Sequence, residues 1–466
     1  HSAPSGFKAL CTTNLPTPTI ADGSTAFDAK LWTGTGSSRS ITSYGFSPDW
    51  VWIKQRDTTR SHNIFDVVRG ANKPLFTDQT LAQLSDGRLT SFDSTGFTLD
   101  SDNAVNDNNG SYVGFAWDAG ANSNKTYTVK VVSDSGNKYR FDDFGTSAVT
   151  LDLAEGSTYI FDQSDSSNSG HPLRFSTTSN GTHGGGTEYT TGVTVTGTPG
   201  QAGAKTTIVV AASAPTLFYY CTQHSGMGGQ ANTNSTAGAS NFDSSIQATV
   251  KANPTAGFSI VSWTGNGNTG STLGHGLNAA PKMVIFKNRS GVTNWRVYNT
   301  MADGSLDWLY LNTSAAKSDS GLSLPTSTTF TAGGSSDTNG NGNAMLNLCF
   351  APVEGYSAFG SYEGNNTTNG PFVYTGFKPR WVLIKNIDSS TQEWVILDTA
   401  RNTFNVTGKV LYANTAGAEQ DLGAVNDRHI DILSNGFKVN RGDPLNQAAT
   451  HIFAAFAEHP FKTARA

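Results

Sequence analysis

The sequence predicts an all-β protein made of tandem β-sandwich modules. Short runs rich in Val, Ile, Thr and aromatic residues are separated by Gly, Asn and Asp turns at intervals of roughly 8–12 residues, which is typical of β-sandwiches. No segment has a convincing amphipathic helical pattern, and residues 81–89 would give at most one short helical turn. A third observation, a sequence pattern that recurs along the chain, indicates that the modules are related to one another.

The recurring pattern is centred on an apolar strand that ends in lysine. It reads SPDWVWIK at residues 47–54, APKMVIFK at 280–287 and KPRWVLIK at 378–385. Each copy follows a Gly-Phe or Gly-Leu pair, lies downstream of WTGTG, WTGNG or YEGNN, and precedes an apolar run, YVGFAW, LNLCFA or HIFAAFA. We expect each of these strands to bury one face in a module core, while its lysine extends along the core to reach solvent.

The spacing of the repeats predicts an inserted domain. Trp32 and Trp263 are 231 positions apart, whereas Trp263 and Tyr362 are 99 apart, so the first interval holds an excess of 132 residues. This excess is long enough for a small domain. We therefore predict a first repeat module at 1–122, an inserted domain at 123–232, a second module at 233–355 and a third at 356–466.

The inserted domain holds the residues that most clearly suggest chemistry. The segment FYYCTQHSGMGG places Cys221, His224 and Met227 at three-residue intervals after a strand-like run. A thiolate, two imidazoles and a weak thioether are the ligands of copper sites that transfer electrons. The second imidazole should come from a distant part of the domain; His171, which precedes a proline, is the first candidate and His183 is the second.

Residues from about 125 to 232 resemble the cupredoxins, the family of blue-copper proteins. The resemblance rests on an aromatic strand that enters Cys-x-x-His-x-x-Met and on an upstream histidine beside a proline. It implies an inserted cupredoxin-like β-sandwich in which His171, Cys221, His224 and Met227 hold copper. The alternative is a sandwich of the same kind that keeps the loop for packing and binds no metal, because buried Cys and Met are common core residues.

Composition and motifs argue against several other functions. Only 14% of residues are charged and the net charge is −5, so the chain lacks the broad basic surface that holds nucleic acid. No apolar run approaches the ~18 residues that a membrane-spanning helix needs. The sequence has no nucleophile elbow, zinc-protease motif or phosphate-binding loop, and we predict that the protein is not an enzyme.

The chain as a whole resembles virion proteins of marine bacteriophages. The resemblance covers nearly all residues and rests on the lysine-terminated strand pattern, the junction APVEGYSAFGSYEGN and the end AFAEHPFKTARA. It implies a structural or adhesive part of a tail fibre or other appendage, located on the virion and extracellular.

The same resemblance implies the partners of the chain. They would be other virion proteins and a glycan or receptor of the host cell surface. Appendages sit on symmetric hubs, and a homotrimer would bury apolar faces that single modules leave open, so we expect a trimer. Two other functions stay open: a copper-binding electron-transfer protein and a secreted carbohydrate-binding protein.

Overall fold

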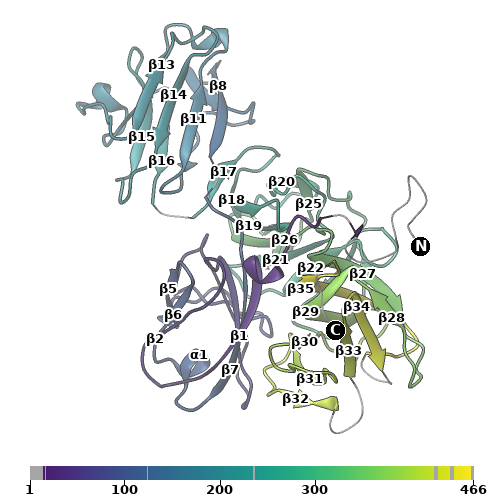
Figure 1. The fold of residues 1–466 in the computed structure, drawn as a ribbon. Helices are drawn as coiled ribbons and strands as arrows, with labels where there is room; N and C mark the ends of the chain where they lie inside the picture. Colours follow the sequence, from purple (N-terminus) through teal and green to yellow (C-terminus); the bar gives the residue numbers. More distant parts are fainter. Residues whose placement is uncertain are drawn as a thin grey trace.

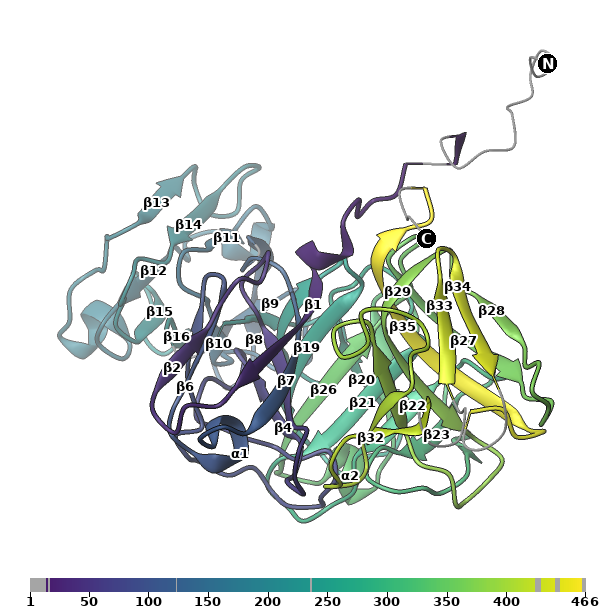
Figure 2. The same cartoon turned by 60° about the horizontal axis from the view of Figure 1, so that its bottom comes forward.

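The chain folds into three similar β modules and a further β unit inserted after the first of them. The structure is a computed structural model that describes residues 14–15, 17–122, 124–234, 237–423, 429–440 and 445–462. Figure 1 shows the inserted unit as a lobe standing off the body that the modules form, and in the view of Figure 2 this lobe lies partly behind the first module. Helices in the described part of the chain are single short turns, so the fold is all-β, as predicted.

The first module consists of two sheets with a core between them. Its strands pair in the order β1-β7-β3-β4 in the larger sheet and β2-β6-β5 in the smaller one. After the short helix η2 (Gly23–Thr25), the elements of this module are β1 (Phe27–Thr33), β2 (Arg39–Ile41), β3 (Trp50–Gln55), β4 (Asn63–Asp66), β5 (Leu89–Asp93), β6 (Gly96–Leu99), α1 (Asn103–Asn106) and β7 (Ser111–Trp117).

The second module repeats this order and adds two strands at each edge of the larger sheet. Its larger sheet runs β17-β18-β19-β26-β21-β22-β23-β24, and β20 pairs with β25 in the smaller sheet. The elements are β17 (Ala239–Asn241), β18 (Ala248–Asn253), β19 (Phe258–Thr264), β20 (Ser271–Gly274), β21 (Met283–Asn288), β22 (Arg296–Asn299), β23 (Asp307–Tyr310), β24 (Ser318–Asp319), β25 (Thr329–Ala332), α2 (Ser336–Asn339) and β26 (Ala344–Phe350).

The third module follows after a short connection and has the same plan. Its larger sheet runs β27-β35-β29-β30-β31-β32 and its smaller sheet runs β28-β34-β33. The elements are β27 (Ser357–Glu363), β28 (Phe372–Tyr374), β29 (Phe377–Asn386), β30 (Val395–Asp398), β31 (Lys409–Tyr412), β32 (Gln420–Asp421), β33 (His429–Leu433), β34 (Gly436–Asn440) and β35 (Thr450–Pro460).

Strand register shows that the three sequence repeats occupy equivalent places. Trp50 of β3 lies opposite Trp117 in the first module, Met283 of β21 lies opposite Phe350 in the second, and Trp381 of β29 lies opposite Phe456 in the third. The strands on both sides of each pair also correspond in the three larger sheets. The repeat read from the sequence is therefore a repeat of structure.

The inserted unit is a separate two-sheet sandwich. Its sheets run β13-β14-β11-β8-β9 and β10-β16-β15-β12. Phe242, from beyond the last of these strands, packs against Tyr127 and Phe141 in its core. The elements are β8 (Lys125–Ser133), β9 (Asn137–Phe141), β10 (Leu151–Asp152), β11 (Thr158–Asp162), η3 (Ser166–Asn168), β12 (Leu173–Ser176), η4 (Gly181–Gly184), β13 (Val193–Thr196), β14 (Lys205–Val209), β15 (Leu217–Cys221) and β16 (Gly229–Asn232).

The lysine-terminated strands are buried on both faces, not on one as the sequence led us to expect. In β3, Val51 and Ile53 point into the core of the first module, while Trp50 and Trp52 belong to a second core shared by all three modules. Successive side chains of a strand point to opposite faces, so a continuous apolar run needs a partner on each side. The second partner is the neighbouring modules.

The shared core lies where the three larger sheets meet. The indole rings of Trp117 and Trp381 are perpendicular, with centroids 5.6 Å apart, and join the first module to the third. Trp50 contacts Phe258 of the second module at 5.7 Å. The apolar faces that suggested a homotrimer are thus buried within one chain, and they give no reason to expect a trimer.

Three crossing loops close the modules into a ring. The backbone amide of Gln83 in the first module donates to the carbonyl of Arg289 in the second at 2.9 Å. The backbone amide of Lys317 in the second donates to the carbonyl of Ile387 in the third at 2.8 Å. The backbone amide of Glu419 in the third module donates to the carbonyl of Arg56 in the first at 2.7 Å, which closes the ring. Residues 81–88, where the sequence allowed a helical turn, form no helix and are part of the first crossing loop.

The lysine of each repeat is buried rather than extended to solvent. Lys54, Lys287 and Lys385 are all 0% exposed. The ammonium group of Lys287 donates to the carbonyls of Thr293 in its own module and Thr80 in the first. Lys385 makes the corresponding bonds to its own module and to the crossing loop of the second. The expectation that these lysines reach solvent was wrong, because each buried ammonium group donates to backbone carbonyls. Those of Lys54 belong to its own module, whereas Lys287 and Lys385 each also bond a carbonyl of the neighbouring module.

None of the helices found in the described residues is long and apolar enough to cross a membrane. The longest α-helices there, α1 and α2, have four residues each.

Candidate metal centre

Strand pairing in the inserted unit brings two of the predicted ligands together. Strands β12 and β15 are antiparallel neighbours, and Leu173 lies opposite Cys221. The amide of Thr222 donates to the carbonyl of Pro172 at 3.2 Å, which extends the pairing toward His171. Residues fifty positions apart in the sequence therefore meet at one end of the sandwich.

The geometry of the donor atoms suits a single metal ion. Sγ of Cys221 lies 3.9 Å from Nδ1 of His171 and 3.8 Å from Nδ1 of His224. Possible ligand atoms of the three residues all lie within 4.8 Å of one another. Bonds of roughly 2.0–2.3 Å from one ion to nitrogen and sulfur place such atoms about 3.5 Å apart. A small contraction of the cluster would complete the coordination of an ion.

The site is buried on one side and open on the other. Cys221 is 0% exposed, His171 is half-buried and His224 is exposed. Met227 is 1% exposed and packs in the same core cluster as Cys221. Its backbone carbonyl accepts a hydrogen bond from the amide of Tyr139 at 3.0 Å. The fourth predicted ligand thus lies on the interior side of the loop.

His183, the second candidate for the upstream ligand, has another role. Its Nε2 atom lies 3.0 Å from the carbonyl oxygen of Cys221. A neutral imidazole donates through this nitrogen, so the bond holds the backbone of a ligand rather than a metal ion. The structure groups His171, not His183, with Cys221 and His224.

Buried polar side chains fix the position of His171. Its carbonyl oxygen accepts from the phenol of Tyr139 at 2.9 Å and from Nε2 of Gln163 at 2.8 Å. The other end of the Gln163 amide accepts from the amide of Leu173 at 3.0 Å. Sequence reasoning missed Gln163; the available signal was an amide residue directly after the apolar strand TYIFD.

Asn180 anchors the ligand loop from outside. Its amide donates to Oγ of Ser225 at 2.9 Å and accepts from the backbone of Gly226 at 2.8 Å. Asn180 itself has φ +62°, a left-handed conformation that Asn tolerates. At Gly228 a Cβ atom would lie 1.7 Å from the carbonyl oxygen of Tyr219, so the loop returns to the sheet only through glycine.

Local electrostatics favour the uncharged form of the His171 imidazole. Burial, with a smaller contribution from His224, lowers the pKa of His171 below its usual value. Burial and the neighbouring Cys221 thiol raise the pKa of the Tyr139 phenol. Neutral imidazole is the form that binds metals. Soft sulfur with imidazole nitrogen is a donor set that suits copper, and the residues present therefore fit that metal.

Cys349 offers a contrast with Cys221. It is fully buried in β26, and burial raises the pKa of its thiol far above the usual range. It belongs to no group of possible metal ligands in the described part of the chain. A structural, unreactive thiol is the reading that fits these surroundings.

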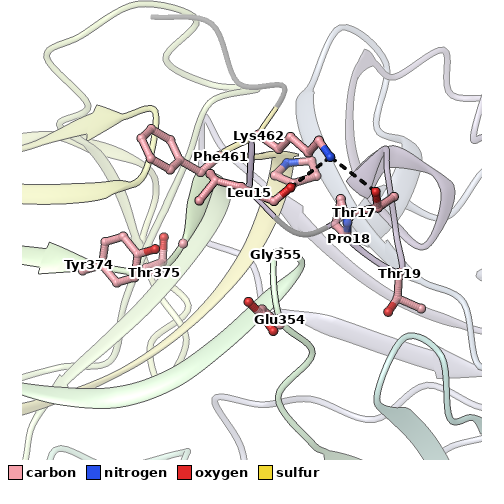
Figure 3. A pocket seen from close by; sticks show the side chains of 12 residues that line it. Leu15, Thr17, Pro18, Thr19, Glu354, Gly355, Tyr374, Thr375, Phe461 and Lys462 are labelled. Atoms are coloured by element: carbon pink, nitrogen blue, oxygen red, sulfur yellow. Dashed lines mark hydrogen bonds between the residues drawn. The ribbon is translucent and has the colours of Figure 1, made fainter. Parts of the chain in front are cut away.

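A separate cavity of about 210 Å³ lies beside the third module. Figure 3 shows the ring of Tyr374 and the side chains of Phe461 and Lys462 around it. The Lys462 ammonium donates to the carbonyl of Leu15 at 3.0 Å, which ties the two ends of the described chain together. Tyr374 is 64% exposed.

A protein-family model matches most of the chain. A family described as a domain of unknown function (DUF7483) matches residues 22–158 and 230–460. The matched stretches contain the three ring modules, and the four predicted copper ligands fall between them, outside the match. The search of curated proteins found no match, and neither did the search of solved structures.

Proposed function

The chain belongs to the family described as a domain of unknown function (DUF7483), and we propose that its inserted unit binds one copper ion. His171, Cys221 and His224 would hold the ion through imidazole nitrogen and thiolate sulfur, and Met227 would add a weaker thioether ligand. The observation that carries this proposal is that donor atoms of the first three residues lie within 4.8 Å of one another. Copper with a thiolate ligand would supply one-electron redox chemistry.

The test is a titration of the purified chain with copper(II). An intense visible band from charge transfer between thiolate and copper is expected, together with one equivalent bound. Cys221→Ser should abolish the band, because serine has no thiolate. Cys349→Ser is the matched control, since that thiol is buried outside the cluster, and should leave the band unchanged. A colourless protein, or a band that survives Cys221→Ser, would refute the proposal.

For the biological setting we propose a structural or adhesive component of a bacteriophage virion. The resemblance of the repeat pattern to virion proteins is the main support. A closed ring of three modules with a shared aromatic core is also suited to a stable extracellular part. In this setting we expect bound copper to be structural or incidental rather than catalytic.

A glycan of the host surface is the ligand class we propose for such an appendage. The exposed Tyr374 ring beside Phe461 offers the apolar faces on which sugar rings stack, with Glu354 near by as a hydrogen-bond acceptor. The purified chain should bind susceptible cells and compete with phage adsorption. Tyr374→Ala should weaken this binding, whereas loss of copper should not.

Electron transfer is the second candidate, and the exposed edge of His224 favours it. It predicts reversible reduction of the copper-loaded chain by a redox partner and no binding to host cells. A secreted carbohydrate-binding protein would instead bind glycans without any virion. Immunogold labelling of phage particles separates this last option from an appendage protein, and sedimentation of the free chain tests the predicted trimer.

A further inference from the structure

The three joints of the ring have equivalent residues that differ in charge. At the joint from the third module to the first, Arg56 forms two hydrogen bonds of 2.8 Å with the carboxylate of Glu419. Arg401 adds a third contact to the same carboxylate at 3.3 Å. Here one half-buried carboxylate bonds to two arginines.

At the joint from the first module to the second, the corresponding carboxylate is missing. Arg289 follows β21 as Arg56 follows β3, and Gln83 crosses to it as Glu419 crosses to Arg56. Arg69 corresponds to Arg401, since each pairs with the aspartate three residues before it. This joint therefore keeps both arginines but has an uncharged amide between them.

The hydrogen bonds at this joint are accordingly weaker. Oε1 of Gln83 accepts from Arg69 at 3.1 Å and from Arg289 at 3.4 Å. Nε of Arg289 is buried without a hydrogen-bond partner among the described residues. Lys73 adds a third cation whose ammonium group donates to the carbonyl of Arg69. Neither Lys73 nor Arg289 forms an ion pair within the part of the chain that the structure describes.

A cavity of about 200 Å³ opens onto these cations. Arg69, Lys73 and Arg289 line it, together with the hydroxyl-bearing Thr249 and Ser262 of the second module. Asp152 of the inserted unit also lines it, and its carboxylate accepts hydrogen bonds from Asn232 and Thr249. The cavity thus lies where the first module, the second module and the insert meet.

The cations repel one another. Burial and the charge of Arg69 lower the pKa of Arg289 to about 10, and burial and Arg289 lower the pKa of Lys73. Like charges held close in a partly buried site favour a bound counter-ion. At the joint from the second module to the third there is no such repulsion between arginines, because Ile387 and Ala302 occupy the positions of the two arginines.

We propose that this cavity is a binding site for an oxyanion, a phosphate or carboxylate group, held by Arg69, Lys73 and Arg289. The anion neutralises the arginines as Glu419 does at the equivalent joint. Guanidinium groups bind such oxygens through charge-assisted hydrogen bonds. The ligand is either free inorganic phosphate or an acidic group on a larger glycan. This site is independent of the copper ligands.

The test measures thermal unfolding of the full chain in phosphate against chloride at equal ionic strength. Phosphate should raise the Tm of the native chain, because a ligand that binds the folded state stabilises it. Arg289→Met should weaken phosphate binding about tenfold or more, since a hydrogen bond to a charged group is worth at least one decade in affinity. Gln83→Glu should abolish the phosphate effect, because it supplies the missing carboxylate internally.

The pseudo-symmetric joint provides the matched control. Glu419→Gln should create a second phosphate-dependent rise in Tm, since it removes the carboxylate that Arg56 and Arg401 share. An acidic oligosaccharide tested in parallel separates the two sources: stabilisation by both ligands assigns a glycan group, and stabilisation by phosphate alone assigns the free ion. No phosphate effect on the native chain, or one that persists in Gln83→Glu, would overturn the proposal.

Discussion

The indole N–H of Trp52 donates to Nδ1 of His62 at 2.8 Å, which fixes the tautomer of a histidine at a joint of the ring. An indole nitrogen can only donate, so Nδ1 of His62 carries no proton. Nε2 of His62 must then donate to the carbonyl of Tyr412 in the third module at 3.0 Å. At the other two joints Trp295 and Trp394 take the place of His62. Their indole nitrogens, which do not titrate, donate to the carbonyls of Phe76 and Tyr310.

We predict that acid weakens the ring at this joint. Burial, followed by the charge of Lys54, holds the pKa of His62 well below its usual 6.5. Below pH 6.5 the unfolded chain binds a proton that the folded chain does not, so the free energy of unfolding should fall as pH decreases from 6.5. Urea unfolding at pH 7 and pH 5 measures this change. His62→Gln keeps a donor and an acceptor but cannot titrate, and should reduce the dependence; an unchanged dependence would exclude His62 as its source.

We predict that alkaline conditions stabilise the folded chain through its buried lysines. Burial lowers the pKa values of Lys54, Lys287 and Lys385 to about 8 each. Between pH 8 and the ordinary lysine pKa of about 10.4 the unfolded chain holds more protons, so the free energy of unfolding should rise with pH. Lys287→Met should reduce this rise, and the exposed Lys205→Met should not. A free energy of unfolding that falls over this range in the native chain would contradict the prediction.

His171 and His183 should behave differently when replaced by alanine. His171→Ala removes a predicted ligand and should abolish the visible copper band. His183→Ala removes only the bond to the Cys221 carbonyl, so the band should persist while the Tm falls. Absorption and calorimetry on the two variants make the comparison. The reverse pattern would reassign the upstream ligand to His183.

Trp381→Ala should destabilise the whole body, not only the third module. The side chain is 2% exposed and contacts Trp117 and Trp52 of the first module. Removing a buried tryptophan typically costs about 3–5 kcal/mol. Denaturant unfolding should show one transition displaced to lower concentration. Val292→Ala, at a side chain 70% exposed, is the control and should change the midpoint little. A separate early transition of the third module alone would mean that the shared core does not couple the modules.

The sequence predicts the place of each repeat strand but not the ring. Trp50, Val51, Trp52 and Ile53 are all apolar, and strand periodicity cannot show which pair faces the module and which faces its neighbours. The burial of Lys287 was missed for the same reason, because folding brings the Thr80 carbonyl to its ammonium group from 207 positions away. Equivalence of Gln83 with Glu419 depends on a crossing bond that no local pattern encodes.

The metal centre was more accessible to sequence reasoning. Cysteine, histidine and methionine occur close together on one loop, and a chemically suitable histidine lies upstream. The choice between His171 and His183 needed the register of β12 against β15, which sets which ring reaches Sγ. Gln163 and Asn180 have no distinctive sequence signal, because they support the site through hydrogen bonds to residues that are distant in the sequence or carry no motif.

The crossing loops also fix the order in which the modules can assemble. Glu419 forms an ion pair with Arg56, which follows β3, whereas Gln83 offers Arg289 only an uncharged amide. Lys317 crosses to the apolar Ile387, and its own charge pairs with Asp307. Exchanging two modules would set the cationic Lys317 against Arg56 and the Gln83 amide against the apolar Ile387. The three modules therefore share a fold but differ in the side chains at their edges, and these side chains favour the native order of the modules in the ring.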